Sequence, residues 1–380
     1  MQHREELSDT LRKVAAGQGI TSLGIAPAVT PAGYHRLLDW LSRGYHGEMH
    51  WMERRRSTSK HPNSMLNGTR SVIMAAVSYY TPPQQTTAGR MSAYVRGTED
   101  YHTVLKRRLQ PLARLIQEAM PEEKTRIVVD SAPLLERDFG QLAGIGWTGR
   151  NTMLISREFG SWFFLAAILT TAELSYDEPE HQNFCGTCTR CLDACPTDAF
   201  PEPYVLDARR CISYFNIELR DRMVPAEFRS GIGDWLFGCD ICQEVCPWNR
   251  FAVPTELSEF AAPTSAALLD ARTILKMSDE EFTRNFQGTP MQRTGAEVLR
   301  RNAALVLGNI RDHAAAAELT TGLRDPFPQV RMACAWSLCQ FGKPEGLEAV
   351  RTAIAAEASE DVRADMIRSL EETPFGSVPA

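Results

Sequence analysis

The sequence predicts three successive parts within its 380 residues: an α/β domain, a cysteine-rich segment and an α-helical tail. Short apolar runs alternate with helix-like stretches over roughly the first 175 residues, which is typical of a layered α/β architecture. Eight of the ten cysteines then fall between Cys185 and Cys246, and Ala- and Leu-rich helical patterns follow. A chain of this length is usually too long to fold around a single hydrophobic core, so we predict domains at 1–175, 176–260 and 261–380.

Composition excludes several classes of protein. Hydrophobic residues make up 43% and charged residues 23%, which is ordinary for a soluble globular protein. No apolar run approaches the roughly 18 residues of a membrane span, and the polar N-terminus lacks an export signal, so we expect a cytoplasmic protein. The net charge of −6 argues against binding a polyanion by bulk charge, so any nucleic-acid contact must use a local patch.

The first part contains recognisable strands and helices. Residues Ser71–Tyr80, Arg126–Asp130 and Ser161–Thr171 are rich in β-forming residues and predict strands, whereas Tyr101–Met120 and the N-terminal 14 residues have helical periodicity. The second strand ends on Asp130, where side chains commonly project into a cleft. The residues alone leave two roles open for this aspartate: a general acid, or the N-cap of a helix over 131–140.

The helical tail repeats with a period of 31 and then 32 residues. Similar helices open at Leu299-Arg300, Val330-Arg331 and Val362-Arg363. This register predicts short-period HEAT-like repeats, with an ordinary helical bundle as the alternative. We expect the recurring arginines to bridge repeats to nearby acids, and Cys334 and Cys339 to be buried apolar residues.

The spacing of the other eight cysteines is typical of two [4Fe–4S] clusters in a bacterial-ferredoxin-like domain. The first block reads C-x2-C-x2-C-x3-C-P, the second reads C-x2-C-x3-C-P, and Cys211 lies between them. The fourth cysteine of such a run serves the other cluster. We therefore assign cluster one to Cys185, Cys188, Cys191 and Cys246, and cluster two to Cys195, Cys211, Cys239 and Cys242. A pair of zinc sites is the alternative, and disulfides are not expected in the reducing cytosol.

Longer motifs then identify a resemblance. The segments that carry it are the VDSAP run at 129–133, the GWTGRN run at 146–151, the DARRCISY run at 207–214 and the GCDICQEVCPWN run at 238–249. Together with the cysteine block, they make the whole chain similar to the epoxyqueuosine reductase family.

The resemblance implies an oxidoreductase that reduces the epoxide of epoxyqueuosine to queuosine at the wobble position of tRNA. It implies a nitroreductase-like N-terminal domain that binds cobalamin, to which the two clusters deliver electrons. It favours Asp130 as the acid that donates a proton, with a pKa raised by burial. It also implies cobalamin contacts at Trp147, Gly149, Arg150, Asn151, Ser213 and Asp240, as well as at Asp130 itself.

The expected partners are the tRNA anticodon stem-loop and an external low-potential electron donor, with the enzyme acting as a monomer away from membranes. Basic clusters at 54–56, 106–108 and 209–210 are candidate phosphate contacts, although each alone is also typical of ordinary helix surface. Two other functions remain open: a reductive dehalogenase-like corrinoid enzyme, and a ferredoxin-type electron carrier with a helical docking tail. We expect His102 to be a surface or packing histidine and not a metal ligand.

Overall fold

The computed structural model describes residues 2–82, 89–260 and 270–373, and the chain divides into two compact units. Unit 1 comprises residues 1–82, 96–209 and 240–262, and unit 2 comprises residues 83–95, 210–239 and 263–380. The start of the tail predicted from residue 261 lies outside the described residues. None of the helices in the described ranges is both long enough and apolar enough to cross a bilayer.

Unit 1 is built on a four-stranded antiparallel sheet with the strand order β1-β2-β7-β4. The bounds are Ser22–Pro27 for β1, Ser71–Ser78 for β2, Thr125–Val128 for β4 and Phe163–Thr170 for β7. The three predicted strands are therefore confirmed, but β4 ends two residues before Asp130. All eight residues of β2 are buried, since both faces of the sheet are covered.

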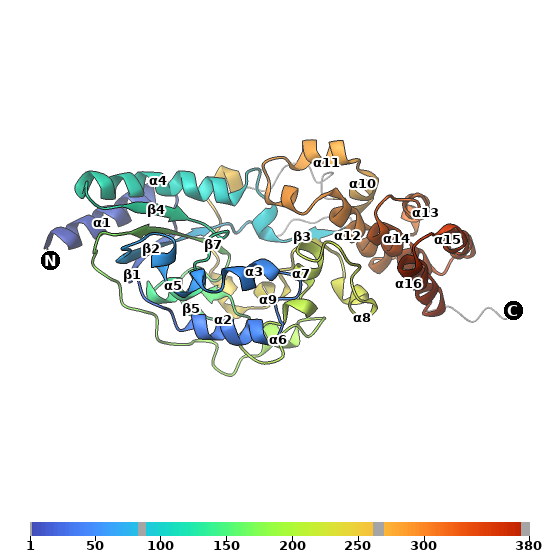
Figure 1. Cartoon of the computed structure of the whole chain (residues 1–380), viewed down its shortest axis with the longest axis horizontal. Coiled ribbons are helices and arrows are strands. Elements are labelled where there is room, and N and C mark those ends of the chain that lie inside the picture. The colour runs from blue at the N-terminus through green and yellow to red at the C-terminus, as the bar shows by residue number, and fades with distance from the viewer. Residues whose placement is uncertain (1, 83–88, 261–269, 374–380) are drawn as a thin grey trace. The chain divides into compact units, whose positions relative to one another are not determined.

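Helices cover both faces of this sheet (Figure 1). Helix α1 (Gln2–Gly17) packs on β1, and α4 (Tyr101–Ala119) packs on β4 and β7. Helix α5 (Glu136–Leu142) packs on the opposite face, where Phe139 joins Met74 and Ala167 in one apolar core. The apolar periodicity that predicted α4 supplies its buried face.

Shorter elements complete unit 1. Helices α2 (Gly33–Ser42) and α3 (His50–Arg55) follow β1, and the small hairpin of β5 (Trp147–Thr148) and β6 (Leu154–Ile155) precedes β7. Beyond β7, the one-turn helices α6 (Arg190–Asp193) and α9 (Ile241–Glu244) lie in the two cysteine blocks and contact each other.

Unit 2 consists mainly of helices. Its short strands β3 (Arg90–Met91) and β8 (Trp235–Phe237) pair in parallel. Helices α7 (Ile212–Ile217) and α8 (Ala226–Arg229) precede β8 in the chain. The tail contains α10 (Ala271–Lys276), α11 (Asp279–Phe286), α12 (Ala296–Asn309), α13 (Ala316–Gly322), α14 (Pro328–Phe341), α15 (Pro344–Ala356) and α16 (Glu360–Glu371).

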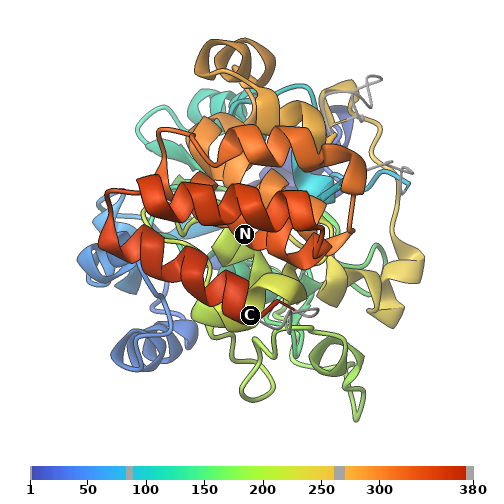
Figure 2. The ribbon, with the colours of Figure 1, turned by 90° about the vertical axis from the view of Figure 1, so that its right-hand side faces the viewer.

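The predicted repeats appear as stacked helices. Helices α12, α14 and α16 carry the three repeated motifs, and α14 contacts both of the others (Figure 2). Arg300 pairs with Asp279 and Asp325, and Arg331 pairs with Glu357. The third arginine, Arg363, instead donates to the backbone carbonyl of Glu357. Both tail cysteines are buried, as expected.

One buried arginine joins the first repeat helix to α7 and to the segment that follows it. The guanidinium of Arg301 donates to the carbonyls of Phe215 (2.5 Å), Leu219 (2.5 Å) and Arg222 (3.1 Å). Its side chain is fully buried, and burial lowers its pKa to about 10. The guanidinium therefore supplies hydrogen-bond donors to three backbone carbonyl oxygens between residues 215 and 222.

Replacing Arg301 by Ala removes these donors, and we expect unit 2 to lose on the order of 3 kcal/mol of stability, because each orphaned buried acceptor costs about 1–3 kcal/mol. Urea denaturation followed by circular dichroism measures the loss. The exposed Arg324, replaced by Ala, is the matched control. Equal midpoints for the two variants would show that the Arg301 contacts contribute nothing.

Candidate iron–sulfur centre and active site

The four cysteines predicted for cluster one line a single cavity in unit 1: Cys185, Cys188, Cys191 and Cys246. Burial, followed by the neighbouring thiol of Cys185, raises the pKa of Cys191 to about 11, and burial also raises the pKa of Cys246. Four thiolates so close together would repel each other unless a cation lay among them. The donor set and its convergence therefore fit an iron–sulfur cluster, whose irons are held by four thiolates.

Aromatic side chains surround this first cysteine group. The indole of Trp147 is buried and donates to Sγ of Cys185 at 3.5 Å, and it packs edge-to-face with Phe184 and Trp248. Hydrogen bonds to sulfur and exclusion of water are two of the factors that set a cluster's reduction potential. Trp147 is therefore placed to tune a cluster held by this group.

The other residues of the Gly-rich turn also contact the cysteine segments. Arg150 donates to the carbonyl of Gly186, and the buried Asn151 donates to the carbonyl of Cys242. A Cβ at Gly149 would lie 2.4 Å from Cδ1 of Ile155, so a larger residue here would require the Ile155 side chain to shift. The structure thus places the predicted corrinoid contacts at 147–151 beside the first cysteine group.

The cysteines predicted for cluster two divide between the units. Cys195 and Cys242 belong to unit 1, whereas Cys211 and Cys239 belong to unit 2 together with Ser213. Within unit 1, the amide of Ala199 donates to Sγ of Cys195 at 3.4 Å. The assignment of these four ligands to one cluster stays a prediction from their spacing. Asp240 is buried, and its carbonyl accepts the first backbone hydrogen bonds of α9.

Asp130 lies on a turn directly after β4 and has the positive φ of 45°, which is uncommon outside glycine. Its Oδ2 accepts a hydrogen bond from the Tyr101 hydroxyl at 2.9 Å and lies 3.1 Å from Nε2 of His102. The alternative that Asp130 caps a helix over 131–140 is wrong, because α5 begins at Glu136 with Leu135 as its N-cap. The Asp130 side chain is 58% exposed, so the burial that was expected to raise its pKa is not observed. Its carboxylate instead contacts Tyr101 and His102 of α4.

His102 is buried and links Asp130 to a second carboxylate. Its Nδ1 lies 2.8 Å from Oδ1 of Asp100, which also caps α4. A neutral imidazole has only one N–H, so both contacts are hydrogen bonds only if the ring or one carboxyl group carries an additional proton. The expectation of a surface or packing histidine is therefore incomplete, since the ring joins two acids that lie 30 residues apart in the chain.

Glu136, which sequence reasoning did not single out as a site residue, supports the Asp130 turn. Its Oε1 accepts a hydrogen bond from the Asp130 amide at 2.8 Å. Burial, together with the nearby Asp130 charge, raises the pKa of Glu136 to about 8, so this carboxyl group is mostly neutral at pH 7. In the sequence, Glu136 and Arg137 follow the VDSAP run and belong to the residues that carry the family resemblance, but nothing there indicates a role for the glutamate.

An open cavity adjoins Asp130 and Glu136. Its far wall comes from α2 and α3 and includes Leu37, Trp51 and Arg55. Arg55 lies 5.6 Å from the Trp51 ring centroid and donates to the carbonyl of Ser131 at 2.8 Å. A planar group could enter here with an indole, a guanidinium and a carboxylate around it.

Comparison with family models defines the class of protein. A model described as a 4Fe-4S double cluster binding domain matches residues 184–249, and one described as HEAT repeats matches residues 291–371. The chain is therefore an iron–sulfur protein with a HEAT-type tail, which confirms both predictions and excludes the zinc alternative. A third model, Epoxyqueuosine reductase QueG, DUF1730, matches residues 60–131.

Relatives give the family. The epoxyqueuosine reductase of Xanthomonas campestris is 38% identical over 87% of this chain and 95% of its own, and that of Pseudomonas aeruginosa is 38% identical over 89% and 95%. A crystal structure of an epoxyqueuosine reductase with a tRNA-Tyr epoxyqueuosine-modified stem loop matches with a TM-score of 0.88 and 30% identity, covering 96% of this chain and 98% of that one. The chain belongs to the epoxyqueuosine reductase family.

We expect Cys191→Ala to lose one of the two clusters, so that iron falls from about eight to about four atoms per chain after anaerobic reconstitution. Iron analysis together with electron paramagnetic resonance measures this loss. Cys334→Ala, which removes a buried thiol of the tail, should retain the wild-type iron content. Full iron content in the Cys191 variant would contradict the ligand assignment.

The raised pKa of Glu136 predicts a pH-dependent effect on stability. Between about pH 4.5 and about pH 8 the folded state holds a proton that the unfolded state releases, so this group lowers the unfolding free energy as pH rises. In Glu136→Gln, the side-chain oxygen can still accept the hydrogen bond from the Asp130 amide, but the side chain cannot ionise. We expect the variant to gain on the order of 1 kcal/mol or more over wild type between pH 5 and pH 8.

Denaturant titrations at the two pH values test this effect, with the exposed Glu158, replaced by Gln, as the matched control. A stability difference between Glu136→Gln and wild type that does not change with pH would show that Glu136 is ionised like a surface carboxylate.

Proposed function

We propose that this chain reduces the epoxide of epoxyqueuosine to queuosine at the wobble position of tRNA, with Asp130 as the proton donor. Family membership supports the reaction. The observation that carries the role of Asp130 is its carboxylate, which shares hydrogen bonds with Tyr101 and His102 at the edge of an open cavity. A structure of the epoxyqueuosine reductase from Bacillus subtilis has its aspartate-bearing catalytic loop swung out of the active site, which supports a catalytic aspartate on a loop.

The reaction requires two electrons and two protons, since removal of the epoxide oxygen as water leaves the alkene. An alkoxide is a poor leaving group, so protonation of the oxygen by a positioned acid assists C–O cleavage. Asp130 Oδ2 supplies this proton in our proposal. His102 lies within hydrogen-bond reach of the same oxygen, so it can return a proton to Asp130, while Asp100 stabilises the charged ring.

The cofactor set is two [4Fe–4S] clusters and a cobalamin in a nitroreductase-like domain, as the sequence resemblance implies. Bound cobalamin would supply a strong metal-centred reductant beside the substrate. The clusters would pass it electrons, one at a time, from an external low-potential donor. Cobalamin contacts at Ser213 and Asp240 stay part of the proposal, whereas the described hydrogen bonds of Arg150 and Asn151 go to cysteine segments.

The cavity beside Asp130 also suits a base that has left the anticodon stack. Trp51 is 41% exposed and offers a stacking surface, and Arg55 lies beside it. Arg54 and Arg56 flank this position on the exposed surface and could contact phosphate. We therefore assign the anticodon stem-loop to the α3 side of the cavity. The proposed enzyme is a monomer that acts in the cytoplasm.

Replacement of Asp130 by Asn tests the proposed acid. Asparagine tolerates a positive φ, so the turn should persist, but the amide cannot donate a proton to the leaving oxygen. We expect turnover of an epoxyqueuosine-containing stem-loop to fall by about 10²–10⁴-fold, with wild-type iron content. Asp39→Asn, on the exposed surface of α2, should retain activity. Near-normal turnover by Asp130→Asn would remove this residue from the mechanism.

A further inference from the structure

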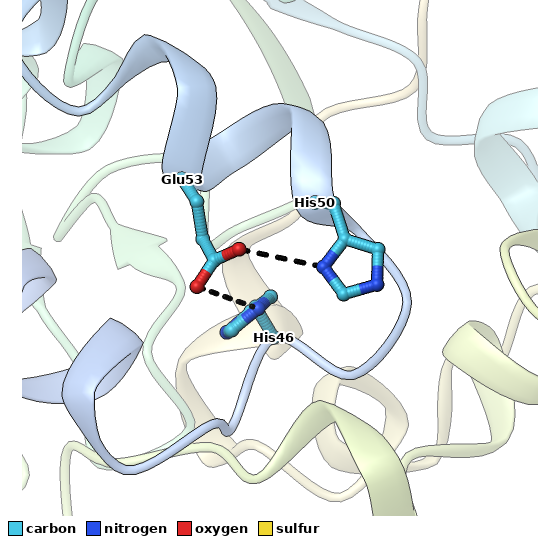
Figure 3. Close-up of side chains that lie close together, drawn as sticks. All are labelled: His46, His50 and Glu53. Atoms are coloured by element: carbon cyan, nitrogen blue, oxygen red, sulfur yellow. Dashed lines mark hydrogen bonds and ion pairs between the residues drawn. The ribbon is translucent and has the colours of Figure 1, made fainter.

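Three potential metal ligands converge on the α2–α3 side of unit 1, apart from the cysteines (Figure 3). His46 lies in the turn after α2, His50 is the first residue of α3, and Glu53 lies one helical turn further along. The Glu53 carboxylate points between the two imidazoles, with Oε1 at 3.5 Å from Nε2 of His46 and Oε2 at 3.4 Å from Nδ1 of His50. One ligand atom from each residue lies within 4.8 Å of the other two.

These separations suit a metal better than they suit hydrogen bonds. A charge-assisted N–H···O contact is usually about 2.7–2.9 Å long, so both contacts are loose. With metal–ligand bonds of about 2.0–2.2 Å, two ligands of a tetrahedral zinc ion lie roughly 3.3–3.5 Å apart. Each nitrogen–oxygen separation therefore has the length of a tetrahedral edge. The two contacts use different oxygens of the Glu53 carboxylate, so an ion held by one oxygen requires the exposed His50 ring to shift toward it.

His46 is the buried and well-packed member of this group. Its side chain is only 7% exposed, and its ring packs near Trp40 with centroids 6.1 Å apart. The Nδ1 atom of His46 is buried and finds no hydrogen-bond partner among the described residues. The other ring nitrogen, Nε2, faces the Glu53 carboxylate. Packing therefore holds the His46 ring with Nε2 facing Glu53, and no hydrogen bond at Nδ1 pulls the ring in another direction.

We propose that His46, His50 and Glu53 bind a divalent transition-metal ion of the zinc class, with a fourth position open to water. Two imidazoles and one carboxylate are a common ligand set for zinc with an open site. The ion would tie the turn after α2 to α3. The same helix presents Trp51, Met52 and Arg55 to the cavity beside Asp130, so occupancy would stabilise this wall without taking part in electron transfer.

Zinc alone, added to the holoprotein, tests the site. Both iron–sulfur clusters must first be assembled anaerobically, because empty cluster cysteines also bind zinc. Dialysis against buffered zinc followed by metal analysis measures zinc and iron together. We expect one zinc per chain at constant iron in the wild type, and at least tenfold weaker binding in His50→Ala and in Glu53→Gln. His35→Ala, an exposed histidine on α2, should bind like wild type.

Both test residues are more exposed than His46, so these variants should fold, and their unchanged iron content shows that they have. Absence of zinc from the wild type, or equal zinc in wild type, His50→Ala and Glu53→Gln, would overturn the proposal. The measurement involves no RNA and no turnover, so its failure is separate from any failure of the proposed reaction.

Discussion

The pairing of β7 with both β2 and β4 is the constraint on which unit 1 depends. Val128, the last residue of β4, lies opposite Ala167, and this register determines where the chain leaves the sheet to reach Asp130. Because α4 packs on β4 and β7, the same pairing brings Tyr101 and His102 to that exit. A slip of one residue would turn the buried side chains to the other face and separate these groups.

Two carboxyl groups at this exit have different environments and different roles. Asp130 is half-exposed and hydrogen-bonded to a hydroxyl and an imidazole, so it can exchange a proton with a substrate. Glu136 is partly buried, its raised pKa keeps it mostly neutral at pH 7, and its carboxyl group accepts a hydrogen bond from the backbone of the turn. The thiols of the first cysteine group lie in a separate cavity, so the proposed acid and the proposed cluster ligands occupy different parts of unit 1.

Local sequence patterns predicted the features that depend on residues close together in the chain. The strands, α4 and the repeat helices follow from hydrophobic periodicity, and the iron–sulfur chemistry follows from the cysteine spacing. The N-cap role for Asp130 failed because residues 131–135 form a turn before α5 begins. The link between His102 and Asp130 arises from packing of α4 on the sheet, across 28 residues, which periodicity cannot show. Unit 1 likewise assembles from three separate stretches of chain, and no local composition signal marks such an arrangement.

This chain belongs to a family that reduces epoxyqueuosine in tRNA, and we propose that its own reduction depends on cobalamin. The most direct measurement is conversion of an epoxyqueuosine-containing anticodon stem-loop by the reconstituted protein under a low-potential reductant, with and without added cobalamin, followed by mass spectrometry of the nucleoside. We expect queuosine, with loss of one oxygen atom, only when cobalamin is present. Equal conversion without cobalamin, or no conversion by protein shown to hold both clusters and the corrinoid, would contradict the proposal.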